Sequence, residues 1–423
     1  MRIAVVTAGG AGMFCGSCMH DNTLARALLA AGHEVTLIPL YTPIRVDEEN
    51  VSQQRVFLGG VNVYLAARYG WWNRVPHVLR GWLDGAGVLK LASRWGVSSD
   101  ARELGALTVA LLRGDLAVHR EAIDDLVNYL LEGTPPDVVL LSNALLGGLV
   151  PVLRQRYSGR VWCLLQGDDI FLQDLVEPWR QQALELLRRL SPLYDGFLTH
   201  SNYYRQFMAE LLGWPVERGR VVPLSIDLQG HTGVPRDTPG QPFTIGYFAR
   251  ICPEKGLQNL LAGFRLLHAR QPGTRLVAAG YLGVRDVPWF DALRQQAADL
   301  GEAFEYQGSP AGHEGKVRFL SQLDLFSVPT SYREPKGLPV LEALANGVPV
   351  VQPAHGAFPE LLERTGGGLL VPPGDSQALA LALERLLLDN SLRRELAHTG
   401  QARVRSLCAA GRLAEETVQA LQG

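Results

Sequence analysis

The chain has 423 residues, a formal net charge of −2, 47% hydrophobic residues and 19% charged residues. This length predicts two or three domains, and the near-neutral charge argues against a dedicated nucleic-acid binder, which would carry a basic excess. The low share of charged residues, with 45 glycines and 25 prolines, indicates a compact enzyme with many tight turns rather than a disordered chain.

The number of cysteines and the lengths of the apolar runs indicate the cellular compartment in which the protein is expected. The five cysteines are an odd number spread over a long chain, which fits reduced thiols better than a disulfide framework. The apolar run after Met1 is too short for a signal peptide, and the run 138–153 is broken by polar residues, glycines and a proline. We therefore expect a cytoplasmic protein without a membrane-spanning helix.

The first half of the chain alternates short apolar runs with segments of helical period. Strands are expected at 3–7, 35–40, 138–141, 161–165, 196–200 and 221–224, and a helix at 23–31. This alternation is typical of βαβ units that build a parallel sheet.

A segment rich in Gly, Pro and Thr, 225–241, then interrupts the pattern before it restarts. Further strands are expected at 243–248, 275–279, 303–306, 325–329, 348–352 and 368–371, with helices at 257–270, 289–300, 314–322 and 338–346. A last helix is expected from Leu392 to the C-terminus, crossing back to the first domain. Two successive Rossmann-like domains, 1–225 and 226–405, followed by a helical tail at 406–423, account for this order.

An aromatic and basic block between Tyr64 and Trp95 does not fit the alternation. One interpretation is an insertion whose tryptophans pack on the first domain. The alternative is a loop that binds an acceptor or touches a membrane peripherally, since Trp and Arg together suit sugar and lipid surfaces.

A glycine-rich loop containing Gly10, Gly12 and Gly16 follows the first expected strand. Glycines let backbone N–H groups approach an anion closely. The spacing is one residue too long for a dinucleotide fingerprint, and no carboxylate ends the second strand, which disfavours nicotinamide chemistry. Cys15 and Cys18 in the same loop are interpreted as small buried thiols, with a redox pair as the alternative.

Two basic residues follow the first strand of the second series. Arg250 lies at the strand end, and Lys255 lies in the turn before the next expected helix. Basic side chains at such a switch point suit a diphosphate, because the positive end of the helix points the same way.

Two carboxylates flank an expected helix start further along. Glu334 lies in the loop before the turn Gly337-Leu338-Pro339, and Glu342 lies eight positions after Glu334, inside the helix. The helix start is an anion site. Carboxylates on both sides of it suit a ligand with hydroxyls on both flanks of its phosphates, which describes a nucleotide sugar.

These motifs, with the Gly-Val-Pro-Val-Val run at 347–351 and the Leu-Val-Pro-Pro-Gly-Asp segment at 370–375, resemble the family-4 retaining glycosyltransferases of the GT-B fold. The resemblance implies two Rossmann-like domains facing each other across a cleft, the acceptor side in the first and the nucleotide sugar in the second. It implies a nucleoside-diphosphate sugar as donor substrate and requires neither a cofactor nor a metal.

The resemblance also assigns roles to residues. Arg250 and Lys255 would neutralise the leaving diphosphate, and Glu334 would contact the donor sugar. The residues assigned to donor binding are Gly10, Gly12, Gly16, Gly337, Leu338, Pro339 and Glu342, of which Glu342 would hold the ribose hydroxyls. The glycine-rich loop could face the acceptor instead.

One departure from the family pattern concerns the acceptor side. Members commonly carry His before Gly-Asp at a first-domain strand end, where this chain has Gln166 before Gly167 and Asp168. Gln166 can donate a hydrogen bond to a sugar hydroxyl but cannot titrate. Asp168 and Asp169 are expected on an extended segment with their side chains on opposite sides, which favours a sugar-hydroxyl contact over a metal site.

The sequence therefore predicts a metal-independent retaining hexosyltransferase with small-molecule donor and acceptor and no nucleic-acid partner. A nucleotide-sugar epimerase or hydrolase on the same fold is one alternative. A non-catalytic sugar-nucleotide binder is the other, because Gln166 replaces a titratable residue.

Overall fold

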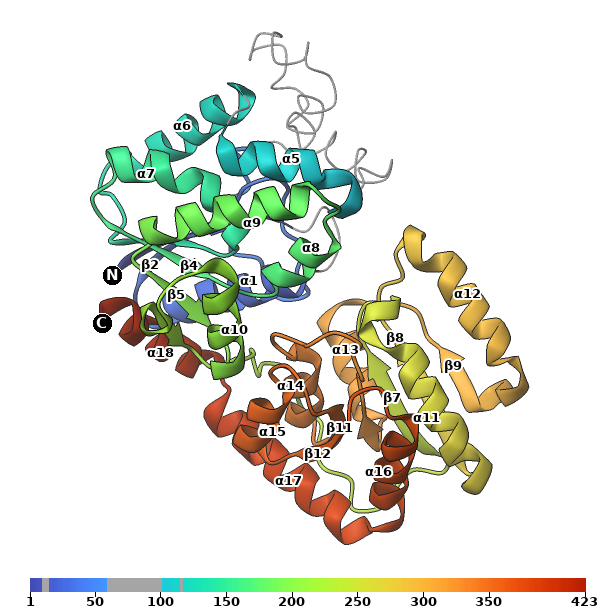
Figure 1. Cartoon of the computed structure of the whole chain (residues 1–423). Helices are drawn as coiled ribbons and strands as arrows, with labels where there is room; N and C mark the ends of the chain where they lie inside the picture. The colour runs from blue at the N-terminus through green and yellow to red at the C-terminus, as the bar shows by residue number, and fades with distance from the viewer. Residues whose placement is uncertain (10–14, 59–100, 115–116) are drawn as a thin grey trace. The chain divides into compact units, whose positions relative to one another are not determined.

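The computed structural model describes residues 1–9, 15–58, 101–114 and 117–423, which form two compact units (Figure 1). The first unit is Met1–Val222 with Leu413–Gly423, and the second is Pro223–Arg412. Gly10, Gly12 and the block from Tyr64 to Trp95 lie outside the described residues. No helix among the described residues is long and apolar enough to cross a membrane.

The first unit is built on a parallel six-stranded sheet in the order β2-β1-β3-β4-β5-β6. Its elements are β1 (Arg2–Thr7), α1 (Gly16–Ala30), β2 (Glu34–Pro39), α5 (Ala101–Arg113), α6 (Ala117–Leu131), β3 (Val138–Leu141), α7 (Val150–Arg156), β4 (Arg160–Leu164), α8 (Asp168–Asp174), α9 (Trp179–Leu190), β5 (Gly196–Thr199), α10 (Asn202–Leu212) and β6 (Gly219–Val221).

Alternation along the strands builds the core of this unit. In β1, Ala4 and Val6 join a cluster that includes residues of α5, α6, α7 and α9. These four helices gather over one part of the unit in Figure 1. Strands covered on both faces read as nearly continuous apolar runs, which explains why the strands of this unit are evident in the sequence.

The second unit is also built on a parallel six-stranded sheet, with the strand order β12-β11-β10-β7-β8-β9. Its elements are β7 (Phe243–Phe248), α11 (Leu257–Arg270), β8 (Thr274–Ala279), α12 (Val287–Gln296), β9 (Phe304–Tyr306), α13 (Gly312–Ser321), β10 (Leu325–Phe326), α14 (Leu338–Ala345), β11 (Val350–Pro353), α15 (Phe358–Thr365), β12 (Gly368–Val371), α16 (Ser376–Leu388) and α17 (Asn390–Leu407). The described residues 222–242, which precede this series, form neither helix nor strand.

Several expected boundaries differ from the structure. Helix α1 begins at Gly16 rather than at residue 23, because its first turns bury polar residues, which hide the apolar period. Strand β10 ends at Phe326 instead of Pro329. The expected single C-terminal helix is two helices, α17 and α18 (Ala410–Gln422). The break occurs where the Cys408 carbonyl accepts a hydrogen bond from Ile226 N at 2.9 Å.

Candidate functional site

The loop after β7 places both predicted cations beside the start of α11. Lys255 ends a short 3-10 turn, and Gly256, at φ 78°, is the N-cap of α11. A Cβ on Gly256 would lie 1.8 Å from the Pro329 carbonyl oxygen. Glycine therefore allows this loop to approach the chain that follows β10, where Glu334 lies.

Lys255 and Glu334 form an ion pair with 2.8 Å between Nζ and Oε2. The Tyr332 hydroxyl donates to the same oxygen at 2.8 Å, and the Lys255 ammonium lies 5.0 Å from the centre of the Tyr332 ring. Burial raises the pKa of Glu334, but the Lys255 charge and these hydrogen bonds outweigh it and hold the pKa below its ordinary value. The buried carboxylate is thus stabilised in its charged form.

Arg250 lies in the same loop with 47% of its side chain exposed. Its Nε donates to Cys252 Sγ at 3.2 Å, and its guanidinium lies 3.8 Å from Glu254. Two cations with different surroundings therefore follow β7. Lys255 is held by a buried carboxylate, whereas Arg250 presents much of its side chain to solvent.

Helix α14 begins at the predicted turn. Gly337 is its N-cap at φ 97°, with no side-chain cap, and Pro339 lies in the first turn. The first N–H groups of a helix lack intrahelical partners and form an anion site. Pro339 has no N–H, and Val340 N donates to the Gly337 carbonyl at 3.0 Å. The backbone N–H groups of Gly337 and Leu338 are therefore the ones suited to a phosphate group.

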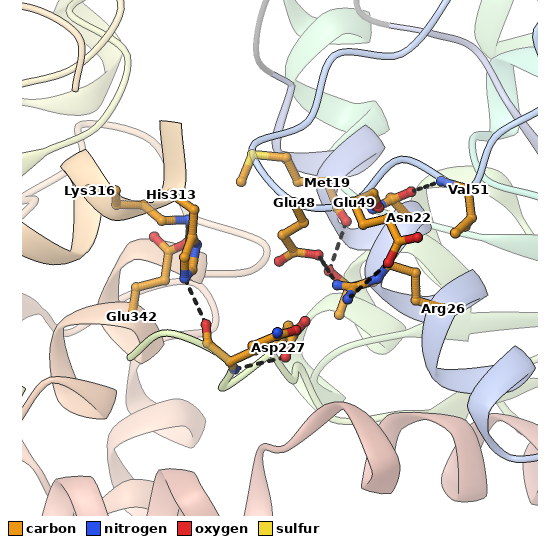
Figure 2. Close-up of polar contacts among 12 residues, drawn as sticks. Met19, Asn22, Arg26, Glu48, Glu49, Val51, Asp227, His313, Lys316 and Glu342 are labelled. Atoms are coloured by element: carbon orange, nitrogen blue, oxygen red, sulfur yellow. Dashed lines mark hydrogen bonds and ion pairs between the residues drawn. The ribbon is translucent and has the colours of Figure 1, made fainter. Parts of the chain in front are cut away.

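Glu342 lies on the buried side of α14 and pairs with Lys316 of α13. Lys316 Nζ donates to Glu342 Oε1 at 2.6 Å, and the two side chains are only 3% and 8% exposed. Figure 2 shows the two side chains directed toward each other, with His313 beside Lys316. The predicted ribose-binding carboxylate is thus held by a buried ammonium.

In the first unit, Gly16 is the exposed first residue of α1, and Gln166 follows β4. The Gln166 amide is buried, and its Nε2 donates to Asp21 Oδ1 at 2.7 Å.

The expectation of an extended segment at Asp168 and Asp169 is wrong, because both residues lie in the first turn of α8. The cause is Gly167, whose φ of 115° turns the chain into the helix.

Backbone groups occupy both carboxylate oxygens of Asp168. Oδ1 accepts from Ala144 N and Oδ2 from Gln166 N. Burial raises the pKa of Asp168 to about 6 despite these hydrogen bonds. The neighbouring Asp169 accepts from the Tyr204 hydroxyl at 2.6 Å. A sugar contact from Asp168 stays a prediction.

Sequence reasoning missed three side chains that the structure brings to these residues, namely Tyr332, Lys316 and Asp21. Tyr332 lies inside the recognised motif, but its contact with Glu334 depends on the loop conformation. Lys316 and Asp21 are helical residues whose charged side chains are almost fully buried. Buried charges require partners, but the sequence does not reveal which helix positions are buried.

Among the described residues, no three His, Cys, Asp or Glu side chains are grouped as metal ligands.

Residues 235–403 match the family model described as glycosyl transferases group 1. The lipopolysaccharide core biosynthesis glycosyltransferase LpsE of Rhizobium meliloti is 30% identical over 249 residues, 54% of this chain and 69% of LpsE. The chain belongs to the group 1 glycosyl transferases.

Two other similarities extend this result. The colanic acid biosynthesis protein WcaL of Salmonella typhimurium is 29% identical to this group 1 chain over 238 residues, 53% of the chain and 54% of WcaL. The chain thus spans about half the length of that relative. The structure of HepE from Anabaena, solved in complex with UDP, matches with a TM-score of 0.68 and 17% identity over 100% of both chains. The two-domain GT-B fold is therefore shared.

Proposed function

We propose that this protein is a retaining glycosyltransferase that moves a sugar from a nucleoside-diphosphate sugar to an acceptor hydroxyl. The proposal depends chiefly on one observation. Lys255, Glu334 and Tyr332 form one partly buried hydrogen-bonded group around the buried Glu334 carboxylate. This group lies in the same unit as the helix start at Gly337, which has no side-chain cap.

Lys255 and Arg250 act on the leaving group in this proposal. An ammonium has three N–H donors, and the bond to Glu334 uses one of them while orienting the others. As the glycosidic bond breaks, negative charge develops on the diphosphate, and Lys255, Arg250 and the α14 start stabilise it. Removing one such preorganised donor costs about 100- to 1000-fold in kcat. Glu334 accepts a hydrogen bond from the donor sugar.

Glu342 binds the nucleoside end of the donor. A carboxylate accepts hydrogen bonds from neighbouring hydroxyls, as a ribose offers, and Lys316 keeps this carboxylate oriented. HepE was solved with UDP and with UDP-glucose, which supports a nucleoside-diphosphate hexose as donor. No metal takes part in this scheme, because the basic groups and the helix start take its place.

The first unit binds the acceptor in this proposal, with Gln166 and Asp168 on the acceptor side. LpsE and WcaL are named for lipopolysaccharide core and colanic acid biosynthesis. These names support a saccharide acceptor. As a separate part of the proposal, the protein acts in the cytoplasm.

A donor panel tests the proposal. UDP-, GDP- and ADP-hexoses are each incubated with the protein and mono- and oligosaccharide acceptors, and nucleoside diphosphate and product are measured. We expect acceptor-dependent release and an α-linked product from an α-linked donor. Lys255→Met should lower kcat at least 100-fold, whereas the control Arg265→Met, in an exposed pair with Asp299, should not.

The same assay separates the alternatives. Equal release without an acceptor would identify a hydrolase, and an isomerised nucleotide sugar would identify an epimerase. Thermal stabilisation by a nucleotide sugar without any release would identify a non-catalytic binder. Each of these results contradicts the proposed transfer.

A further inference from the structure

A carboxylate on α1 is hydrogen-bonded to the side chain of Gln166. Asp21 is 0% exposed, Gln166 is 5% exposed, and Gln166 Nε2 donates to Asp21 Oδ1 at 2.7 Å. The two residues lie 145 positions apart in the sequence. The fold therefore places a buried carboxylate of α1 against the residue that follows β4.

The chemistry of this contact sets the direction of the amide. A carboxylate offers only acceptor oxygens, whereas a glutamine side chain has one end that donates and one that accepts. The Gln166 NH₂ group must face Asp21, so its carbonyl oxygen is directed away from Asp21. Gln166 lies at the carboxyl end of a parallel strand, the edge at which open α/β sheets bind ligands.

The surroundings of Asp21 are not those of a stabilising core contact. His20 Nδ1 lies 3.9 Å from Asp21 Oδ1, and the His20 ring packs edge-on against His200 with 4.4 Å between centroids. Asp21 Oδ2 has no hydrogen-bond partner in the part of the chain that the structure describes. A buried carboxylate with one unsatisfied oxygen costs stability. A neutral side chain would serve the core better, so the carboxylate points to a functional role.

We infer that Asp21 is a positioning residue that fixes the Gln166 amide so that its carbonyl oxygen accepts a hydrogen bond from a sugar hydroxyl. The inference depends on the proposed transferase function and extends it. It reverses the role expected from the sequence, in which Gln166 donates to the sugar. The hydroxyl belongs to the acceptor or to the donor sugar, and the experiment distinguishes the two.

The test compares Asp21→Asn with the double variant Asp21→Asn/Gln166→Glu in the full chain. In the single variant, the introduced amide can donate or accept, so the Gln166 side chain loses its fixed direction. Transfer kcat/KM should fall about tenfold, the effect of one hydrogen bond. In the double variant, the amide introduced on α1 donates to the carboxylate introduced after β4, which again presents an acceptor oxygen. The value of kcat/KM should then recover to within about threefold of the wild type.

Thr23→Val is the matched control, because it removes a partly buried hydroxyl of the same helix. Thr23 Oγ1 lies 3.1 Å from Glu48 Oε2 and 3.0 Å from the Met19 carbonyl oxygen. Figure 2 shows Glu48 among the neighbours of α1. This variant should lower Tm without lowering kcat/KM. The Asp21→Asn variant should show the opposite pattern, lower kcat/KM with a Tm that does not fall, because the variant removes a buried carboxylate with an unsatisfied oxygen.

Donor hydrolysis without acceptor separates the two sources of the hydroxyl. If the hydroxyl belongs to the acceptor, Asp21→Asn lowers transfer only, and if it belongs to the donor sugar, hydrolysis falls equally. The inference is overturned if the folded Asp21→Asn variant has the wild-type kcat/KM, or if the double variant does not restore the lost kcat/KM. Either result leaves the proposed transferase function intact. If the wild type releases no nucleoside diphosphate from any donor, the proposed function and the inference both fail.

Discussion

Individual carboxylates in this protein are buried in different ways, and their pKa values are shifted in opposite directions. Glu334 is paired with Lys255, which favours the charged form. Asp168 is held by backbone N–H groups alone, and burial raises its pKa to about 6. The first arrangement suits binding and charge stabilisation, whereas the second ties the strand end at Gln166 to the chain at Ala144.

The pKa of Asp168 predicts a pH-dependent stability. Because the folded-state pKa lies above the unfolded value of about 3.9, the protonated acid stabilises the fold below about pH 4. This contribution is lost as pH rises through about 6. Asp168→Asn lacks this titration, so the wild type should lose stability relative to the variant between about pH 4 and about pH 7.

Urea denaturation of both proteins across this range measures the effect. A constant difference in unfolding free energy would show that Asp168 does not titrate there. Asp169→Asn provides a comparison on the same helix turn, because the Asp169 carboxylate accepts from the Tyr204 hydroxyl.

At the scale of secondary-structure elements, α13 and α14 are joined by the Lys316–Glu342 pair. Lys316→Met should destabilise the fold by about 3–5 kcal/mol, because it leaves a buried carboxylate without its cation. Lys316→Met/Glu342→Met should regain most of this loss, since two apolar side chains can replace a buried pair. The double variant should nevertheless lose nucleoside diphosphate affinity.

Thermal unfolding and nucleotide titration measure the two effects separately. Recovery of stability together with unchanged affinity would remove Glu342 from the proposed ribose site. Arg265→Met breaks an exposed pair with Asp299, and we expect a much smaller change in Tm from it.

A second prediction concerns the start of α11. Gly256→Ala introduces a Cβ 1.8 Å from the Pro329 carbonyl oxygen at a φ of 78°, so the loop must move. Gly374 has a similar φ of 74° with nothing within 4 Å of an added Cβ. Gly374→Ala should therefore cost only the backbone strain, about 1 kcal/mol, whereas Gly256→Ala should cost more and reduce turnover as well.

Tm and kcat of the two alanine variants decide this prediction. Equal effects of the two variants would mean that the approach of the Gly256 loop to Pro329 is not required. Such a result would also weaken the link between this loop and the position of Lys255.

At the scale of the whole molecule, the chain passes from the first unit to the second at Val222 and returns at Leu413. Helix α18 buries Leu413, Ala414, Thr417 and Leu421, and Arg160 donates to the Leu421 carbonyl. The buried residues of α18 therefore belong to the first unit.

Leu421→Ala should lower the unfolding temperature of the first unit, since a buried leucine truncated to alanine costs about 2–5 kcal/mol. Gln419→Ala, on the same helix, is the control. Calorimetry with and without UDP or GDP assigns the transitions, because in our proposal the nucleotide stabilises the second unit. A loss confined to the nucleotide-stabilised transition would contradict the placement of α18.

The sequence by itself determined the βαβ alternation, the linker and the family motifs, because these depend on neighbouring residues. The strand at 243–248 and the helix at 257–270 have the predicted bounds. Prediction failed where polar residues are buried, as in the first turns of α1, or where one glycine redirects the chain, as at Gly167 before α8.

Only the tertiary structure decided which charged groups meet. Lys255 and Glu334 are 79 positions apart, Lys316 and Glu342 are 26 apart, and Asp21 and Gln166 are 145 apart. Such contacts arise from strand order and helix packing rather than from local periodicity. The sequence identified Lys255, Glu334, Glu342 and Gln166, and the fold supplied their partners, because a buried charge or amide is satisfied by whatever the packing brings within hydrogen-bond distance.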